Sequence, residues 1–149
     1  VLGRTVLIDY AHNGMSFRAV ADVCRKISRG RLVAVFGSVG GRGYDRRAEL
    51  AAAAEACFDF SVITSDNPGF ESPEKICLEI YNGFNDKSRA NIVTDREAAI
   101  RFAFENTRPG DVLLLLGKGA ETGQSVRGGK VPFSEKEILK NIKNLAENA

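Results

Sequence analysis

Histidine and cysteine are scarce in this sequence of 149 residues, which contains one histidine and three cysteines. One histidine cannot complete a zinc site, and no two cysteines form a C-x-x-C pair, so the sequence contains no zinc motif. The three cysteines are odd in number and lie far apart in largely apolar segments. We therefore expect Cys24, Cys57 and Cys77 to be free thiols packed in a core, as in a protein of the reducing cytoplasm.

Long hydrophobic runs and an excess of charge of one sign are also absent. No apolar run approaches the roughly 20 residues that span a bilayer, and the first residues do not have the pattern of a signal peptide. The net charge is +2, and the basic residues are spread along the sequence. Neither nucleic acid nor a membrane is therefore expected as a partner.

Apolar strands alternate with amphipathic helices, and this pattern predicts an α/β fold. A chain of this length is sufficient for one domain with its own core. The expected strands are 5–9, 31–36, 60–64, 91–94 and 112–116. The expected helices are 16–28, an alanine-rich segment that ends near 57, a segment that begins at 73, and 96–106. The order predicts a mostly parallel sheet covered on both faces. A small hairpin within 122–133 and a last helix after the capping box Ser134-x-x-Glu137 complete the prediction.

Polar segments follow three of the expected strands, at Asp9–Asn13, Asp66–Pro68 and Gly117–Glu121. The carboxyl ends of parallel strands form the edge where α/β domains bind ligands, so these segments predict a binding face.

Each polar side chain on this predicted face has a functional and a structural interpretation. Asp66 and Asn67 can bind an amino and a carboxylate group, or form an Asx turn. Glu121 can bind an ammonium group, or lie on the surface near a helix N-terminus. His12 can contact a phosphate or donate a proton, or be a structural histidine.

A glycine-rich loop, Gly37–Gly43, follows the second expected strand. Its glycines do not have the G-x-G-x-x-G spacing of a dinucleotide site, and the sequence has no Gly-Lys-Ser/Thr of a P-loop. The glycines permit close approach of the backbone to a ligand, and the guanidinium of Arg42 suits a carboxylate. The alternative is a flexible loop with a solvated arginine.

Taken together and in order, these segments resemble the C-terminal domain of the Mur ligases. The resemblance extends over nearly the whole chain, through Asp9-Tyr-Ala-His-Asn13, Gly40-Gly-Arg42, Thr64-Ser-Asp-Asn-Pro68, Gly110-Asp111, Gly117-Lys-Gly-x-Glu121 and a hairpin ending at Phe133. It is strongest to members that add the third peptide residue to UDP-N-acetylmuramoyl-L-alanyl-D-glutamate. The resemblance implies a Rossmann-like three-layer domain that receives the incoming amino acid and closes over ATP. In such enzymes the acceptor carboxylate becomes an acyl phosphate, which the new amino group attacks.

The resemblance also implies roles for individual residues. The positions that match the amino-acid site of the family are Arg42, Asp66, Asn67, Pro68, Gly117 and Glu121. Asp9, His12 and Asn13 match the segment that approaches the nucleotide. No catalytic or metal-binding residue is expected in this domain. ATP and Mg2+ are expected to bind mostly to a central domain, and the UDP substrate to an N-terminal domain, neither of which lies in residues 1–149. We therefore expect one domain of a longer cytoplasmic enzyme, inactive alone.

Two departures from the family pattern concern the amino acid. Enzymes of the family that add meso-diaminopimelate have Asp-Asn-Pro-Arg and Gly-Lys-Gly-His-Glu, whereas this sequence has Gly69 and Ala120 at the arginine and histidine positions. Glycine cannot make the bidentate contact of an arginine with a second carboxylate. The expected substrate is therefore L-lysine or another diamino acid with one carboxylate, and meso-diaminopimelate is the alternative.

Two other functions are compatible with parts of the pattern. Folylpolyglutamate and cyanophycin synthetases, which are related amide ligases, also have segments like Asp-x-Ala-His-Asn. A non-catalytic α/β binding module is the third interpretation. The Asp66–Pro68 segment and the Gly-Lys-Gly-x-Glu run argue against the related ligases, and a P-loop encoded upstream would distinguish a ligase from a binding module.

Overall fold

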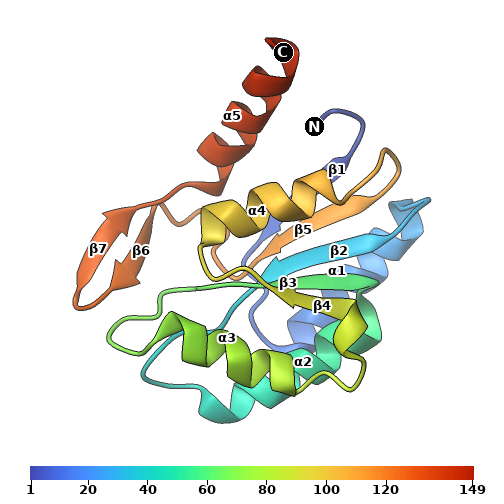
Figure 1. Cartoon of the computed structure of the whole chain (residues 1–149). Helices are drawn as coiled ribbons and strands as arrows, with labels where there is room; N and C mark the ends of the chain where they lie inside the picture. Colours follow the sequence, from blue (N-terminus) through green and yellow to red (C-terminus); the bar gives the residue numbers. More distant parts are fainter.

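A five-stranded parallel sheet lies at the centre of the computed structural model, which describes all residues 1–149 (Figure 1). The strands are β1 (Thr5–Asp9), β2 (Leu32–Phe36), β3 (Phe60–Ile63), β4 (Ala90–Ile92) and β5 (Val112–Leu116). Their order across the sheet is β1-β5-β2-β3-β4, and every neighbouring pair is parallel. All five carboxyl ends therefore lie at the same edge, as the sequence predicts.

Helices cover both faces of the sheet, which confirms the predicted three-layer α/β fold (Figure 1). Helices α1 (Gly14–Ile27), α2 (Tyr44–Cys57) and α3 (Pro73–Asn82) pack on one face. Helices α4 (Arg96–Glu105) and α5 (Glu135–Glu147) pack on the other. A short 3-10 helix, Lys87–Arg89, precedes β4 and was not predicted. None of the helices combines the length and the apolar character that crossing a membrane requires.

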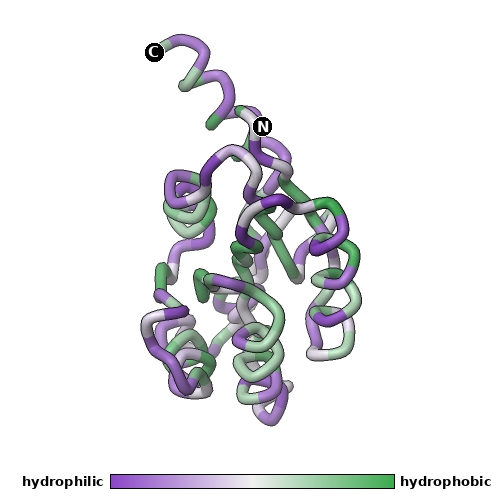
Figure 2. The backbone as a smooth tube through the Cα atoms, turned by 90° about the vertical axis from the view of Figure 1, so that its right-hand side faces the viewer, coloured by the Kyte–Doolittle hydropathy of each residue, from purple (hydrophilic) through white to green (hydrophobic).

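The two-residue period of the strands divides the core into two parts. In β2, Leu32, Ala34 and Phe36 belong to the cluster under α1, α2 and α3, whereas Val33 and Val35 belong to the cluster under α4 and α5. Because β2 is covered on both faces, all five of its residues are buried, and its sequence is an unbroken apolar run. The strands accordingly form the hydrophobic centre of the molecule in Figure 2.

Side-chain caps fix where the helices begin. The side chains of Ser72, Asp95 and Ser134 accept backbone N–H groups of α3, α4 and α5, and the cap at Ser134 is the one predicted above. The sequence analysis placed the start of α1 at residue 16, but a capping box between Asn13 and Ser16 begins the helix at Gly14. The apolar spacing of α5 predicts one buried face formed by Ile138, Leu139, Ile142 and Leu145; the first three are buried, whereas Leu145 is 64% exposed.

The predicted hairpin is a separate antiparallel pair, β6 (Gly123–Val126) and β7 (Gly129–Pro132). A backbone bridge joins Gly69, in the loop after β3, to Val126 at the end of β6. The N–H of Gly69 donates to Ser125 O at 3.0 Å, and the N–H of Arg127 donates to Gly69 O at 2.7 Å. The hairpin therefore lies directly against the loop that carries Asp66 and Asn67.

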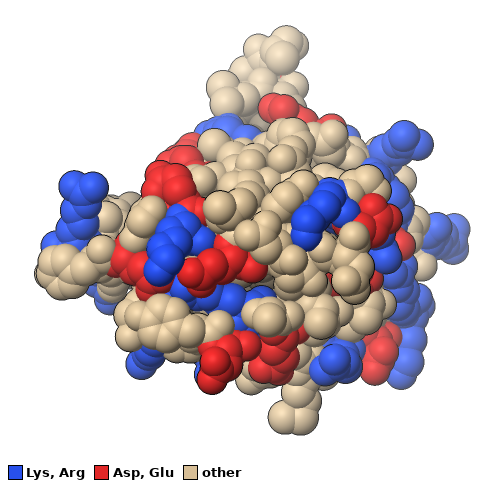
Figure 3. Space-filling model, turned by 60° about the horizontal axis from the view of Figure 1, so that its bottom comes forward, with Lys and Arg blue, Asp and Glu red and all other residues tan.

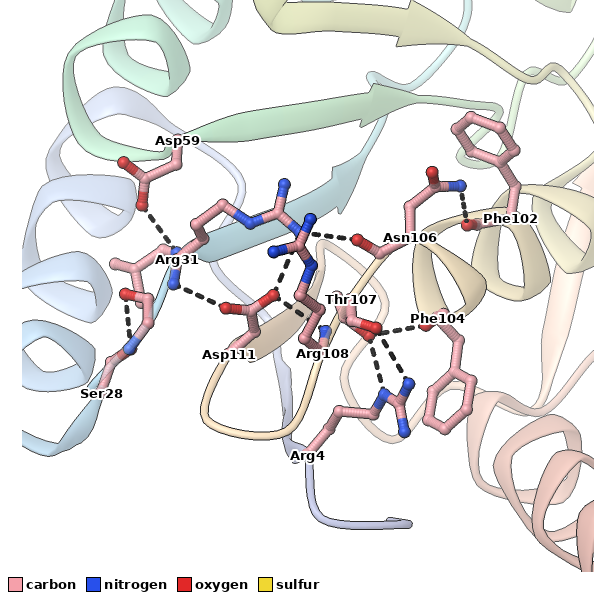
Figure 4. A network of polar contacts seen from close by, with 12 residues as sticks. Arg4, Ser28, Arg31, Asp59, Phe102, Phe104, Asn106, Thr107, Arg108 and Asp111 are labelled. Atoms are coloured by element: carbon pink, nitrogen blue, oxygen red, sulfur yellow. Dashed lines mark hydrogen bonds and ion pairs between the residues drawn. The ribbon is translucent and has the colours of Figure 1, made fainter.

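The opposite edge of the sheet is closed by a polar network centred on Asp111 (Figure 4). Its carboxylate accepts the backbone N–H groups of Arg31 at 2.8 Å and Arg108 at 2.9 Å, and also the guanidinium of Arg31 at 3.1 Å. Arg4 joins the network through Thr107, to whose hydroxyl and carbonyl oxygens it donates. The Gly110-Asp111 pair of the sequence pattern thus serves the fold, and the carboxyl edge is left for a ligand.

All three cysteines are free. Cys24 and Cys77 are buried in the cluster under α1, α2 and α3, and Cys57 packs against it. Burial raises the pKa of Cys77 to about 12, so its thiol stays protonated and unreactive. The prediction of core thiols is confirmed.

Candidate functional site

A pocket of about 360 Å³ opens where the loops after β1, β2, β3 and β5 converge. It is lined by Tyr10, His12, Gly37, Ser38, Val39, Arg42, Gly43, Arg46, Asp66, Asn67, Gly117 and Glu121. Arg42, Asp66, Asn67, Gly117 and Glu121 were predicted to bind one ligand, and the structure brings all five together. Arg42 follows β2, Asp66 and Asn67 follow β3, and Gly117 and Glu121 follow β5. Because these parallel strands end at the same edge of the sheet, the topology alone accounts for the convergence of the five residues.

The pocket is lined by both cationic and anionic side chains. Arg42 and Arg46, from the glycine-rich loop and the start of α2, line it without an ion-pair partner. Asp66 and Glu121 line it from the loops after β3 and β5. A small zwitterion, with a carboxylate and ammonium groups, is complementary to this arrangement of charge. Arg46 was not predicted, because its sequence position fits an ordinary helix start equally well.

Lys118 lies next to Asp66 and Asn67 but does not line the pocket. Its side chain is fully buried, with Nζ 3.1 Å from Asn67 Oδ1 and 3.6 Å from Asp66 Oδ1. Burial lowers the pKa of Lys118, although the carboxylate of Asp66 opposes this change. The ammonium group offsets part of the cost of burying Asp66, which is 4% exposed. The sequence analysis did not single out Lys118; its signal is a lysine two residues after an unbroken apolar strand.

Asn67 holds three segments together. Its Oδ1 accepts Lys118 Nζ and, at 2.9 Å, the N–H of Ser125, while its Nδ2 donates to Glu121 Oε2 at 3.3 Å. These partners are distant in sequence, so the side chain does not form the Asx turn that was the structural alternative. The backbone of Asn67 has a φ of +46°, in the left-handed region that asparagine tolerates better than most residues. One N–H of the amide is left for a ligand.

The close approach of neighbouring loops explains why a glycine occupies position 117 and how Pro68 contributes to the site. Gly117 has a φ of +105°, and a Cβ there would lie 2.6 Å from Asp66 Oδ2. Pro68 is buried and does not line the pocket; instead, its carbonyl oxygen would be 1.7 Å from a Cβ on Gly40. Pro68 therefore contributes to the site through its backbone, by packing the loop after β3 against the glycine-rich loop.

The three residues expected to approach a nucleotide differ in their availability. Asp9 Oδ1 accepts the N–H of Ala11 at 2.8 Å, and Asn13 Oδ1 caps α1 through the N–H of Ser16. His12 is exposed, lines the pocket, and has Nδ1 2.9 Å from Tyr10 O. Asp9 and Asn13 thus shape the loop, and His12 is the member of the set that lines the pocket.

The glycine-rich loop is held by an ion pair behind the pocket. Glu71 Oε1 accepts the N–H of Gly41 at 2.9 Å, and both carboxylate oxygens accept the guanidinium of the buried Arg47, at 2.7 and 2.9 Å. Arg47 also donates to Val39 O at 3.3 Å. From its place near a helix start, Arg47 is expected either in solvent or paired with a carboxylate, and the structure shows the pairing. Arg42, which follows Gly41, is thereby presented on a fixed loop.

No group of three His, Cys, Asp or Glu side chains is close enough to hold a metal ion. The donor set of the pocket, two guanidiniums and two separated carboxylates, suits an organic zwitterion better than Mg2+, which prefers clustered oxygen ligands.

The fold and the pocket define a Rossmann-like α/β domain with a charged pocket at the carboxyl edge of its sheet. Comparison with known proteins identifies the family. Residues 1–119 match the family model described as "Mur ligase, glutamate ligase domain", and the chain belongs to the Mur ligase family.

Two relatives show how far the similarity extends. The chain is 41% identical over 138 residues to the UDP-N-acetylmuramoyl-L-alanyl-D-glutamate–2,6-diaminopimelate ligase of Aquifex aeolicus, a match covering 93% of this chain and 29% of that protein. A solved structure of a UDP-N-acetylmuramoyl-L-alanyl-D-glutamate–2,6-diaminopimelate ligase matches with a TM-score of 0.91 at 30% identity, covering 97% of this chain and 30% of that one. The chain therefore spans less than a third of the length of these relatives.

A more distant structure shares the fold alone. A bifunctional folylpolyglutamate synthase/dihydrofolate synthase, solved with Mn, AMPPNP and L-glutamate bound, matches with a TM-score of 0.59 at 20% identity over 78% of this chain and 27% of that one. The related amide ligases considered as an alternative thus share the architecture, while the sequence places this chain with the Mur ligases.

Proposed function

We propose that this chain is the C-terminal domain of an ATP-dependent amide ligase and that its pocket binds a diamino acid, which the enzyme joins to UDP-N-acetylmuramoyl-L-alanyl-D-glutamate. The observation that carries the proposal is the charge of the pocket, which is lined by two guanidiniums without an ion-pair partner and by two carboxylates. The name of the Aquifex aeolicus relative supports the same substrate class. The enzyme would serve peptidoglycan precursor synthesis in the cytoplasm.

Each side chain has a defined task in this proposal. Arg42 binds the α-carboxylate of the incoming amino acid through its planar fork of donors. Asp66 and Glu121 bind the ammonium groups, and Asn67 keeps the two loops that carry them together. The α-amino nitrogen, once deprotonated, attacks the carbonyl carbon of the acyl phosphate; a C–N bond forms, the C–O bond to phosphate breaks, and phosphate leaves. This domain contributes by orienting the nucleophile.

The remaining steps belong to parts of the enzyme outside this chain. We propose that a central domain binds ATP and Mg2+ and that an N-terminal domain binds the UDP substrate, because the chain spans less than a third of its relatives. When bound, ATP supplies the phosphoryl group that activates the acceptor carboxylate. His12 is the residue of this chain placed to meet the nucleotide. The isolated domain would then bind the amino acid weakly and would not ligate.

Two diamino acids are candidate substrates, and a different observation favours each. Gly69 and Ala120 favour L-lysine or another diamino acid with one carboxylate, because neither side chain can bind a second carboxylate. The names of the relatives do not support that preference and favour 2,6-diaminopimelate. Arg46, which lines the pocket without an ion-pair partner, is a group that can bind a second carboxylate there.

Substitution of Asp66 and Arg42 in the full-length enzyme tests the pocket. Each loses a charge-assisted hydrogen bond of about 1.5–3 kcal/mol, which corresponds to about tenfold or more in affinity. Asp66→Ala and Arg42→Ala should therefore raise the KM for the amino acid at least tenfold and leave the KM for ATP unchanged, in steady-state phosphate-release assays.

Glu97→Ala and Arg101→Ala are matched controls, because these residues form an exposed pair on α4, away from the pocket. They should behave as the wild type. If Asp66→Ala and Arg42→Ala both retained the wild-type KM for the amino acid, the assigned pocket would be wrong.

A further inference from the structure

Arg96 is a buried charge in an unfavourable position. It is the first residue of α4, where the helix dipole disfavours a cation, and its side chain has no exposed surface. A buried guanidinium is stable only when its donors are paired. The partners of Arg96 therefore show why an arginine is placed there.

Two of these partners are the carbonyl groups that directly precede the acidic loops of the pocket. The guanidinium donates to Ser65 O at 3.2 Å and to Leu116 O at 2.8 Å. Ser65 precedes Asp66, and Leu116 precedes Gly117. The strands β3 and β5 are not neighbours in the sheet, because β2 lies between them. One side chain thus spans the end of β2 and joins the two loops that carry Asp66 and Glu121; α4 begins on this side of the sheet (Figure 1).

The third partner lies in the C-terminal helix. Arg96 Nε donates to Glu135 Oε2 at 3.3 Å, and Glu135, the first residue of α5, is 2% exposed. Burial raises the pKa of Glu135, and Arg96 opposes that change. A second contact reaches the same loop from the hairpin, where Gln124 Nε2 donates to Ser65 Oγ at 3.0 Å. These C-terminal residues lie beyond residue 119, where the match to the family model ends.

We propose that Arg96 is a positioning residue of the amino-acid site: it sets the separation of the Asp66 loop and the Gly117–Glu121 loop and couples both to α5 through Glu135. This inference rests on the proposed function, since the separation matters for a ligand that contacts both loops. Asp66 and Glu121 bind different groups of one molecule, so a shift of one loop against the other weakens binding although neither carboxylate is lost.

Kinetics of the full-length ligase test the role of Arg96. Arg96→Lys keeps the charge but loses the planar fork that reaches both carbonyl groups. It should raise the KM for the diamino acid by about tenfold to a hundredfold, with the KM values for ATP and the UDP substrate within about twofold of wild type. Glu135→Gln keeps an acceptor oxygen and should raise the amino-acid KM in the same direction but less. Arg101→Lys and Glu137→Gln, exposed residues of the same two helices, are the matched controls.

Hydrogen exchange of the same full-length proteins separates this inference from the proposed function. Arg96→Lys should speed amide exchange in both loops, at residues 65–67 and 116–121, whether or not the enzyme ligates. An unchanged amino-acid KM together with unchanged exchange would overturn the inference, as would an equal rise of all three KM values. If the wild type ligates none of the diamino acids while Arg96→Lys still speeds amide exchange in both loops, the proposed function is rejected. The coupling of the two loops through Arg96 is then still supported. If Arg96→Lys does not fold, Glu135→Gln provides the same measurements.

Discussion

At the level of single residues, the two carboxylates that line the pocket, Asp66 and Glu121, each contact another polar side chain. Lys118 contacts both Asp66 and Asn67, and Asn67 in turn contacts Glu121. Removing one partner of a buried ion pair costs about 3–5 kcal/mol, because the other charge is left uncompensated. The two carboxylates of the pocket are therefore held in place by the fold itself, and such preorganisation would reduce the entropy lost when the proposed ligand binds.

Substitution of Gly69 and Ala120 tests which amino acid the enzyme selects. Gly69 has a φ of +60°, and a Cβ there would meet no atom within 4 Å, so the first atom of a side chain is accommodated, although the backbone is strained at a cost of about 1–2 kcal/mol. In the full-length enzyme, Gly69→Arg with Ala120→His should raise the ratio of kcat/KM for meso-diaminopimelate over L-lysine by about tenfold, since a bidentate contact with the second carboxylate is gained.

Gly69→Ala is the control for this double variant, because it introduces the backbone strain without the guanidinium. It should lower both values of kcat/KM together and leave their ratio unchanged. A ratio in the double variant equal to that of the wild type would show that these two positions do not select the amino acid.

At the level of elements, Glu71 joins two loops that follow different strands. It lies between β3 and α3, and it holds both the backbone of Gly41 and the guanidinium of Arg47 in the loop and helix that follow β2. Hydrogen bonds from Arg47 lower the pKa of Glu71 from 4.5 to about 2. Because the folded-state pKa is the lower one, ionisation of Glu71 stabilises the fold above pH 4.5, and this stabilisation is lost as the pH falls towards 2.

Glu71→Gln should therefore lower the Tm at neutral pH, and the difference in Tm from the wild type should shrink between pH 4.5 and pH 2. Thermal unfolding followed by circular dichroism across this range measures the difference. Glu97→Gln, at an exposed pair, is the control and should change Tm little at any pH. A difference as large near pH 2 as at pH 7 would contradict the assigned ion pair.

Most elements could be predicted from local pattern, and the exceptions have physical causes. The limits of β5 were predicted to the residue, because an unbroken apolar run bounded by polar loops has few alternative readings. The predicted start of α1 was two residues too late. The helix begins at the capping box formed by Asn13 and Ser16, and the spacing of apolar residues does not reveal a cap. The exposure of Leu145 could not be predicted, because apolar spacing continues past the point where α5 leaves the core.

The convergence of the candidate site residues follows from the strand ends, whereas their roles stay predictions. Five expected ligand-binding residues line one pocket, since parallel strands bring their carboxyl ends together. Lys118, Arg96 and Glu71 were not predicted as parts of the site, because their roles depend on tertiary pairing. Lys118 and Asn67, for example, are 51 residues apart. Local sequence patterns do not encode which distant partner a buried charge finds. The roles proposed for Asp9, His12 and Asn13 towards a nucleotide stay predictions.

At the level of the whole molecule, acidic and basic side chains are mixed on the surface and the net charge is small. On the face shown in Figure 3, Lys and Arg lie beside Asp and Glu over most of the surface, although basic side chains predominate along its right-hand edge. The net charge of +2 agrees with this mixture. The charged lining of the pocket is therefore a local arrangement made by four loops at one edge of the sheet. The hairpin and α5 contact these loops or the residue that joins them, through Ser125 and Glu135.

The measurement that tests the account most directly is phosphate release by the full-length enzyme with ATP and UDP-N-acetylmuramoyl-L-alanyl-D-glutamate. L-lysine, L-ornithine and meso-diaminopimelate would be compared with L-norleucine, which has the same α-amino acid group and no second ammonium. A pocket with carboxylates for two ammonium groups predicts phosphate release that depends on at least one of the diamino acids and is not stimulated by L-norleucine. Equal stimulation by L-norleucine, or none by any diamino acid, would contradict the assignment of Asp66 and Glu121 to a diamino-acid site.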